Sequence, residues 1–294
     1  MAIPRVLFVT GKGGTGKSTV AAALAVALAR RSVVTLADLD RRLSAAAMLG
    51  AAPTDSTPVK VNKSLEVVAL STRAEVEAFI ERIVPVRAIS RRMLRSRTFG
   101  YVTAALPGLE AFLLLERLRI MAGDAALKDQ YVVIDAPASG TAIELLSVAT
   151  GVKGIAPTGT LNRLAHQVDA FLADPALFGA IVTVAPEELA ILEAAETVLA
   201  LRERIKTATV AAIMNRAPAA LFEAHEIESL GALRAHAALA HKRRSAQENA
   251  ARGAERLKSA GLRTIVLPMI FSETIGPREL DTLADAMETE LIAS

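Results

Sequence analysis

Gly11-Lys12-Gly13-Gly14-Thr15-Gly16-Lys17-Ser18-Thr19 is the stretch that decides the expected fold of this 294-residue chain. It satisfies the pattern G-x-x-x-x-G-K-[ST], which joins a strand to a helix in proteins that bind nucleotide phosphates. An apolar run, Arg5–Thr10, precedes it, and a segment with helical periodicity, Lys17–Arg30, follows it. Glycines let the backbone curl so that successive N–H groups face phosphate oxygens, and the helix start adds its own unpaired N–H groups. We therefore expect a phosphate site at Gly11–Thr19.

Two side chains of this loop are expected to contact the phosphates or their metal ion. Lys17 can reach the β- and γ-phosphates, and the hydroxyl of Ser18 can ligate Mg²⁺.

Lys12 places a second lysine in the loop, in the form K-G-G-x-G-K-[ST]. This form resembles the deviant Walker A loop of the MinD/ParA/ArsA group of P-loop ATPases. The resemblance implies ATP and Mg²⁺ as cofactors, and a dimer in which Lys12 reaches the nucleotide of the partner subunit. A solvated loop lysine is the alternative interpretation.

Short apolar runs rich in β-branched residues alternate with helix-period segments, which predicts an α/β fold with a doubly wound, mostly parallel sheet. The expected strands are Arg5–Thr10, Val33–Ala37, Leu65–Leu70, Tyr131–Asp135, Ala180–Val184, Thr209–Met214 and Thr264–Leu267. The expected helices are Lys17–Arg30, Arg73–Ile83, Leu109–Met121, Leu161–Ala173, Glu187–Arg204 and Pro277–Leu291. We expect a single P-loop domain over residues 1–294, with a loop at Ala51–Lys63. Helical insertions are expected at about 85–119 and 219–257, the second broken near Gly231 and Gly253.

Three carboxylates follow expected strands, at the edge of the sheet where the loop lies. Asp38 and Asp40 leave Val33–Ala37 on one side, and Asp135 ends a strand with the Walker B pattern. We expect Ser18, Asp38 and Asp135 to surround Mg²⁺. The resemblance places Asp40 in switch I and implies that it orients the attacking water, as a catalytic group beside Lys12 and Lys17. Arg41 stands where the family has proline, so a purely electrostatic role for Asp40 is the alternative.

Two further stretches owe their interpretation to the resemblance. Ala136-Pro137-Ala138-Ser139-Gly140-Thr141 resembles switch II of the ArsA family, in which Gly140 would let the backbone follow the γ-phosphate; Thr141 replaces the family's histidine. Asn215 ends one expected strand and Pro268 ends another, where relatives contact the adenine.

The likeness extends to Leu65–Pro85, Phe99–Arg119 and Val182–Glu196, which resemble bacterial ArsA-like proteins. These are relatives of the eukaryotic ATPase that targets tail-anchored membrane proteins. The chain has no cysteine, so it lacks the thiolates of arsenite activation and the Cys-x-x-Cys zinc clamp of that targeting ATPase. The resemblance thus implies an ATP-hydrolysing switch that drives a client or partner protein, as a homodimer or as a heterodimer with a related ATPase.

The amino-acid composition limits the functions and the cellular location that can be expected. A hydrophobic content of 52% supports a large core, and a net charge of +3 is too small to imply nucleic acid by itself. No apolar run reaches the ~18–20 residues that span a bilayer, so a cytoplasmic protein is expected. Two other functions remain open. The first is a ParA/MinD-like positioning ATPase; its ParA-like form would bind DNA through basic clusters, namely Arg87, Arg91, Arg92, Arg95 and Arg97, or His241–Arg244, whereas the acidic tail Leu280–Ser294 disfavours MinD-like membrane cycling.

The second is a degenerate ATP-binding module that would act as a structural partner.

Overall fold

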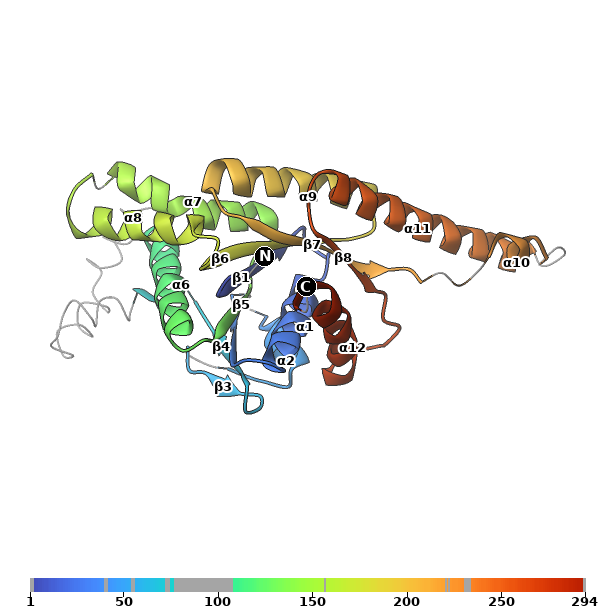
Figure 1. Cartoon of the computed structure of the whole chain (residues 1–294), viewed down its shortest axis with the longest axis horizontal. Helices are drawn as coiled ribbons and strands as arrows, with labels where there is room; N and C mark the ends of the chain where they lie inside the picture. Colours follow the sequence, from blue (N-terminus) through green and yellow to red (C-terminus); the bar gives the residue numbers. More distant parts are fainter. Residues whose placement is uncertain are drawn as a thin grey trace.

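The computed structural model describes residues 3–39, 42–53, 56–71, 75–76, 108–155, 157–219, 221, 223–229 and 234–292. Within these residues, eight strands form one sheet in the order β3-β4-β2-β5-β1-β6-β7-β8 (Figure 1). All neighbours are parallel except β3 and β4, which pair antiparallel. The strands are β1 Val6–Gly11, β2 Val34–Asp38, β3 Val59–Lys60, β4 Leu65–Ala69, β5 Tyr131–Asp135, β6 Phe178–Val184, β7 Thr209–Ala217 and β8 Thr264–Pro268. The predicted doubly wound, mostly parallel α/β fold is confirmed.

Helices cover both faces of the sheet (Figure 1). One face carries α1 Lys17–Ala29, α2 Ser44–Met48 and α12 Pro277–Met287, the last followed by the π-helical turn η2 Glu288–Ile292. The other face carries α6 Leu109–Leu127, α7 Ser139–Ile155, α8 Gly159–Ala173, α9 Glu188–Ala200 with its π-helical turn η1 Leu201–Ile205, and α11 Arg234–Ser259. No helix in the described part of the chain is long and apolar enough to cross a membrane.

Strand β1 shows why its sequence is apolar throughout. Leu7 and Val9 pack on the face of α1, whereas Val6 and Phe8 pack on the face of α6–α9. All four side chains are fully buried, because a parallel strand between two helical layers has no solvated face.

The prediction of a helix break near Gly253 is wrong, because α11 continues through it to Ser259. A Cβ at Gly253 would overlap the side chain of Ile191 and lie 3.1 Å from the methyl group of Met214. Glycine is therefore needed here for the close approach of α11 to α9 and β7. Gly231, the other expected break, lies outside the described residues.

Some other elements differ from the prediction. Helix α7 was not predicted, and β3 lies inside the expected loop Ala51–Lys63. In the expected insertion at about 85–119, the part from Leu109 onward belongs to α6, which buries Phe112, Leu115 and Leu118 against the sheet. Residues 85–107, and most of the expected helix Arg73–Ile83, lie outside the described residues.

The second insertion forms an arm. Helix α10 (Ala224–Ser229) and the first half of α11 extend beyond the carboxyl end of β7, on the far right in Figure 1. The arm therefore leaves the molecule at the edge where the phosphate loop lies.

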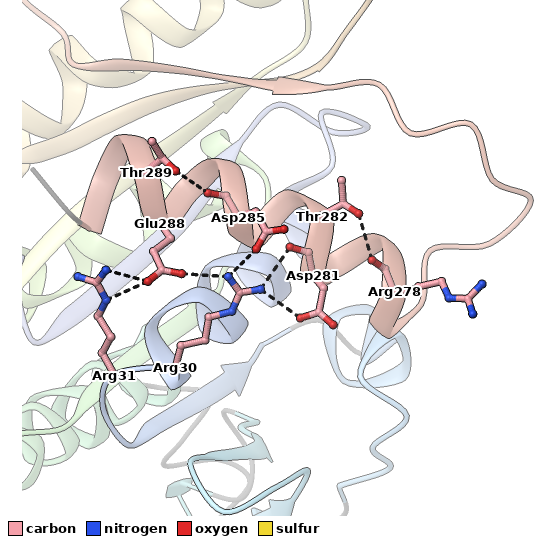
Figure 2. Close-up of polar contacts among 8 residues, drawn as sticks. All are labelled: Arg30, Arg31, Arg278, Asp281, Thr282, Asp285, Glu288 and Thr289. Atoms are coloured by element: carbon pink, nitrogen blue, oxygen red, sulfur yellow. Dashed lines mark hydrogen bonds and ion pairs between the residues drawn. The ribbon is translucent and has the colours of Figure 1, made fainter.

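A cluster of ion pairs joins the end of α1 to α12 and η2 (Figure 2). Arg30 lies 2.6 Å from Asp285, 2.9 Å from Glu288 and 3.4 Å from Asp281. Arg31 lies 2.8 Å from Glu288. The hydrogen bonds that Arg30 donates to Asp285 and Glu288 raise the pKa of Arg30, and those that Arg30 and Arg31 donate to Glu288 lower the pKa of Glu288. Both arginines lie at the carboxyl end of α1, where the helix dipole also favours a cation.

Candidate active site

Two glycines give the phosphate loop its shape. Gly11 ends β1 with φ +149°, and a Cβ there would overlap the carbonyl oxygen of Thr183 in β6. Gly16 has φ +88° immediately before α1, and a Cβ there would overlap the side-chain amide of Asn215. A side chain at either position would be strained by the backbone angle and by its neighbour, so the loop requires glycine at both.

Hydroxyl groups fix the loop to β6. The Thr15 hydroxyl donates to the carbonyl of Lys12 over 2.9 Å and lies 2.7 Å from the Thr183 hydroxyl. With the Thr15 proton on Lys12, Thr183 is the donor to Thr15, and its hydroxyl also lies 3.1 Å from the carbonyl oxygen of Thr10. Thr15 and Thr183 are almost fully buried, so this chain of neutral hydrogen bonds stabilises the loop without using any of its charge.

The end of β7 holds the loop from the other side. The side-chain amide of Asn215 donates to the carbonyl of Thr15 over 3.0 Å, and Arg216 donates to the carbonyl of Gly14 over 2.5 Å. Arg216 has φ +59°, and the register with β8 shifts between Met214 and Ala217. This bulge turns Arg216 toward the loop.

The phosphate loop and the first turn of α1 present backbone N–H groups toward the outside of the molecule. The first helical hydrogen bond of α1 runs from the N–H of Val20 to the carbonyl of Gly16, so the N–H groups of the first turn have no partner within the helix. Gly13 and Gly14 are exposed, with open space beside them. Such a helix start, preceded by a curled glycine loop, has the geometry of an anion site. Phosphate binding at Gly11–Thr19 stays a prediction.

The two lysines of the loop lie in different surroundings. The ammonium of Lys17 is 3.5 Å from the carbonyl oxygen of Lys12. Lys12 turns away and forms a 2.6 Å ion pair with Glu193 of α9, with the two side chains 46% and 41% exposed. Beside this pair, a groove of about 410 Å³ runs between the first turn of α7 and α9; its carboxylates are Glu144, Glu193 and Glu196.

The sheet brings Asp38 and Asp135 side by side. They are register partners at the carboxyl ends of β2 and β5, and both are buried. Strand β5 is the direct neighbour of β1. Two positions earlier, Leu36 and Val133 pack on the face of α1; by the alternation of strands, both carboxylates project to that same face. Ser18 lies in the first turn of α1 on this face, so the three expected metal ligands converge on one edge.

These residues fit Mg²⁺. Two buried carboxylates on neighbouring strands repel each other unless a cation lies near them, and carboxylate and hydroxyl oxygens are the ligands that Mg²⁺ prefers. The Oδ2 atom of Asp38 accepts one hydrogen bond, 3.3 Å from the backbone N–H of Ala46.

The remaining predicted site residues differ in how they lie relative to the phosphate loop. Asp40 lies outside the described residues. The carbonyl of Pro137 accepts a 2.9 Å hydrogen bond from Thr10, next to the loop. Gly140 lies in the first turn of α7 instead of a loop, and it lines the groove between α7 and α9. Its movement with the γ-phosphate stays a prediction.

Asn215 and Pro268 lie close together at the carboxyl ends of β7 and β8, since Pro268 pairs with Ala217. Asn215 supports the loop, and its side-chain oxygen Oδ1 accepts a 3.0 Å hydrogen bond from the backbone N–H of Arg216. Its predicted adenine contact stays a prediction. Sequence reasoning missed Thr183, Glu193 and Arg216 as loop contacts. Only Thr183 left a signal, as a hydroxyl inside the otherwise apolar run Phe178–Val184.

Comparison with known proteins decides the family. The family described as anion-transporting ATPase matches residues 4–158, more than half of the chain. The chain belongs to the anion-transporting ATPase family. The matched part contains the phosphate loop, Asp38, Asp135 and the Pro137–Gly140 segment, so the predicted ArsA-type relationship is confirmed.

Mycobacterial proteins are similar to this member of the family. They include "ATPase BagA" of Mycobacterium tuberculosis and "Putative ATPase Mb3704" of Mycobacterium bovis. Each is 28% identical over 174 residues, which cover 56% of this chain and 51% of the relative. The chain therefore spans about half the length of these curated relatives.

Proposed function

We propose that this protein binds ATP with Mg²⁺ at the phosphate loop, hydrolyses it as a dimer, and uses the cycle to drive a partner protein. One observation carries the proposal: an outward-facing cradle of backbone N–H groups lies beside the two buried, adjacent carboxylates of Asp38 and Asp135. A cradle alone would suit any small anion, whereas the added carboxylates suit a phosphate chain that carries a metal ion.

Each group has a defined task in this proposal. The N–H groups and Lys17 bind and orient the phosphates, and Ser18, Asp38 and Asp135 hold Mg²⁺. When bound, Mg²⁺ neutralises negative charge on the phosphate oxygens. Asp40 orients the attacking water. Catalysis then rests on positioning and on stabilisation of charge, as in other phosphoryl transfers.

The surroundings of Lys12 support a dimer. Its ion pair with Glu193 is solvated on both sides, and exposed pairs of this kind contribute little to stability. The phosphates of a nucleotide on a second subunit carry more negative charge than one carboxylate. They would therefore compete well for the ammonium once two subunits meet.

Light scattering with Mg²⁺ and a non-hydrolysable ATP analogue, run beside a steady-state ATPase assay, tests the proposal. The wild-type protein should shift from monomer to dimer and turn over ATP. Lys12→Ala should still bind ATP but stay monomeric and lose turnover, whereas Lys258→Ala on the exposed face of α11 should behave as wild type. Normal dimerisation and turnover in Lys12→Ala would contradict the proposed role of this lysine.

A DNA-retention assay and the turnover measurement separate the two alternative functions. ATP-dependent, salt-sensitive retention of DNA would favour a positioning ATPase of the ParA type. ATP binding without turnover in the dimer would favour a degenerate binding module. Because the chain has no cysteine, coordination of arsenite by thiolates forms no part of the proposal.

A further inference from the structure

A groove of about 450 Å³ lies between α7, α8 and the π-helical turn η1. Helices α7 and α8 pack side by side there, on the face of the sheet that also carries α6 and α9 (Figure 1). Its basic side chains are Lys153 of α7, His166 of α8, Arg204 of η1 and Lys206, and its carboxylate is Asp169 of α8. We call it the basic groove.

The basic groove lies at the opposite edge of the sheet from the phosphate loop. Helix α8 ends at Ala173 and leads into β6, and Lys206 leads into β7, which begins at Thr209. Both lining residues therefore lie near the amino ends of parallel strands, whereas the phosphate loop lies at the carboxyl ends. Strand β6 has seven residues, and a strand of that length spans roughly 20 Å. A ligand in the basic groove would thus be separate from a nucleotide at the loop.

The charges of the basic groove do not cancel. Lys153 and Asp169 form an ion pair with each other. The side chains of Arg204 and Lys206 form no hydrogen bond or ion pair with the part of the chain that the structure describes. Arg204 also lines the groove between α7 and α9, and even there no described carboxylate pairs with it. Two positive charges therefore remain for a ligand.

The backbone that carries these two cations is anchored to the core. Leu201, at the start of η1, is fully buried, and its carbonyl accepts the N–H of Thr207 over 3.0 Å. The buried hydroxyl of Thr207 donates to the carbonyl of Leu172 in α8 over 2.8 Å. Between these anchors Lys206 has φ +66°, a left-handed conformation that is unfavourable for a residue with a side chain. The turn is thus fixed in one shape beside α8.

We propose that the basic groove binds the phosphate group of a small phosphate ester. The planar guanidinium of Arg204 can donate two parallel hydrogen bonds to phosphate oxygens, and the ammonium of Lys206 adds a second positive charge. His166 offers a ring N–H. Ala173 and Ile205 give the groove an apolar wall for the organic part of the ester. Its volume lies in the range of small-molecule sites.

Calorimetric titration with phenyl phosphate tests this site. Arg204→Gln and Lys206→Gln remove one positive charge each, so each should weaken phenyl phosphate binding roughly tenfold. Inorganic phosphate lacks the apolar part and benzyl alcohol lacks the charge, so both should bind wild type more weakly. Arg202→Gln is the matched control, because Arg202 lies on the same turn but pairs with Glu203 at 3.6 Å. It should bind phenyl phosphate as wild type does.

Lys17→Ala distinguishes the basic groove from the phosphate loop, since it should leave the binding that depends on Arg204 unchanged. Binding that is lost in Lys17→Ala but normal in both groove variants would place the probe at the loop and overturn the proposal. An equal loss in Arg202→Gln would also overturn it, because general attraction to a basic surface would then explain the binding. Equal affinity for inorganic phosphate would overturn the assignment to an ester. Thermal unfolding checks that each variant is folded.

Discussion

The two ends of α1 use charge in opposite ways. At its carboxyl end, Arg30 and Arg31 are surrounded by the carboxylates of Asp281, Asp285 and Glu288 (Figure 2). At its amino end, Lys17 forms no ion pair with any residue that the structure describes. Its ammonium group lies 3.5 Å from the carbonyl oxygen of Lys12. The loop there is held by neutral hydroxyl and amide groups instead.

The difference separates stabilisation from binding. Charges that are already paired can only hold α1 against α12, because a ligand would have to displace their partners. Charge and N–H groups that the fold leaves without a strong partner are available to a ligand, at some cost to stability. Substitutions at the two ends should therefore change different measured quantities.

Lys17→Ala should give the largest effect. It removes a charge-assisted contact to phosphate, so ATP affinity should fall roughly 100-fold. The unfolding temperature should not fall, since Lys17 makes no ion pair in the described structure. Calorimetric titration and a thermal melt measure both quantities. A variant that melts much earlier yet binds ATP would reverse the comparison.

Asp135→Asn should give the next largest effect. It removes one of two adjacent buried carboxylates, so Mg²⁺-dependent turnover should fall roughly 10–100-fold. Less repulsion from Asp38 should keep the unfolding temperature from dropping. Turnover measured against Mg²⁺ concentration tests this, and wild-type Mg²⁺ dependence would remove Asp135 from the metal site.

Arg30→Ala should affect stability alone. Loss of the exposed three-carboxylate cluster should lower the unfolding temperature by roughly 2–4 °C, with ATP affinity unchanged. Arg278→Ala is the matched control, because Arg278 lies on α12 but points away from the cluster (Figure 2). Weaker ATP binding in Arg30→Ala would show that the two ends are coupled.

The smallest effect is a pH dependence at Glu288. Its pKa lies below the ordinary 4.5, because Arg30 and Arg31 donate hydrogen bonds to the carboxylate. The stabilisation is therefore complete above pH 4.5 and is lost as the pH falls through the lowered pKa. The unfolding temperature of Glu288→Gln should lie below that of wild type at pH 6, and the gap should close in acid. In a background that lacks both arginines, the gap should be absent at every pH.

The sequence predicted the elements whose pattern is local. Tyr131–Asp135 ends where expected, because a buried strand requires an unbroken apolar run and the carboxylate marks its end. The phosphate loop was also predictable, because its own backbone angles and close contacts require its glycines.

Features that depend on contacts between distant segments were not predictable. Gly253 was expected to end a helix, whereas it allows α11 to approach α9 and β7. The bulge at Arg216 and the ion pair of Lys12 with Glu193 join residues that lie far apart in the sequence. Helix α7 was not expected, because its first residues resembled a switch loop.

Hydrogen exchange with and without Mg–ATP tests the central claim most directly, because it measures the two ends of α1 in one experiment. We predict that ATP protects backbone amides in peptides that cover Gly11–Thr19 and leaves those of Pro277–Ile292 unchanged. Protection that is absent from the loop, or equal at both ends of α1, would contradict the account.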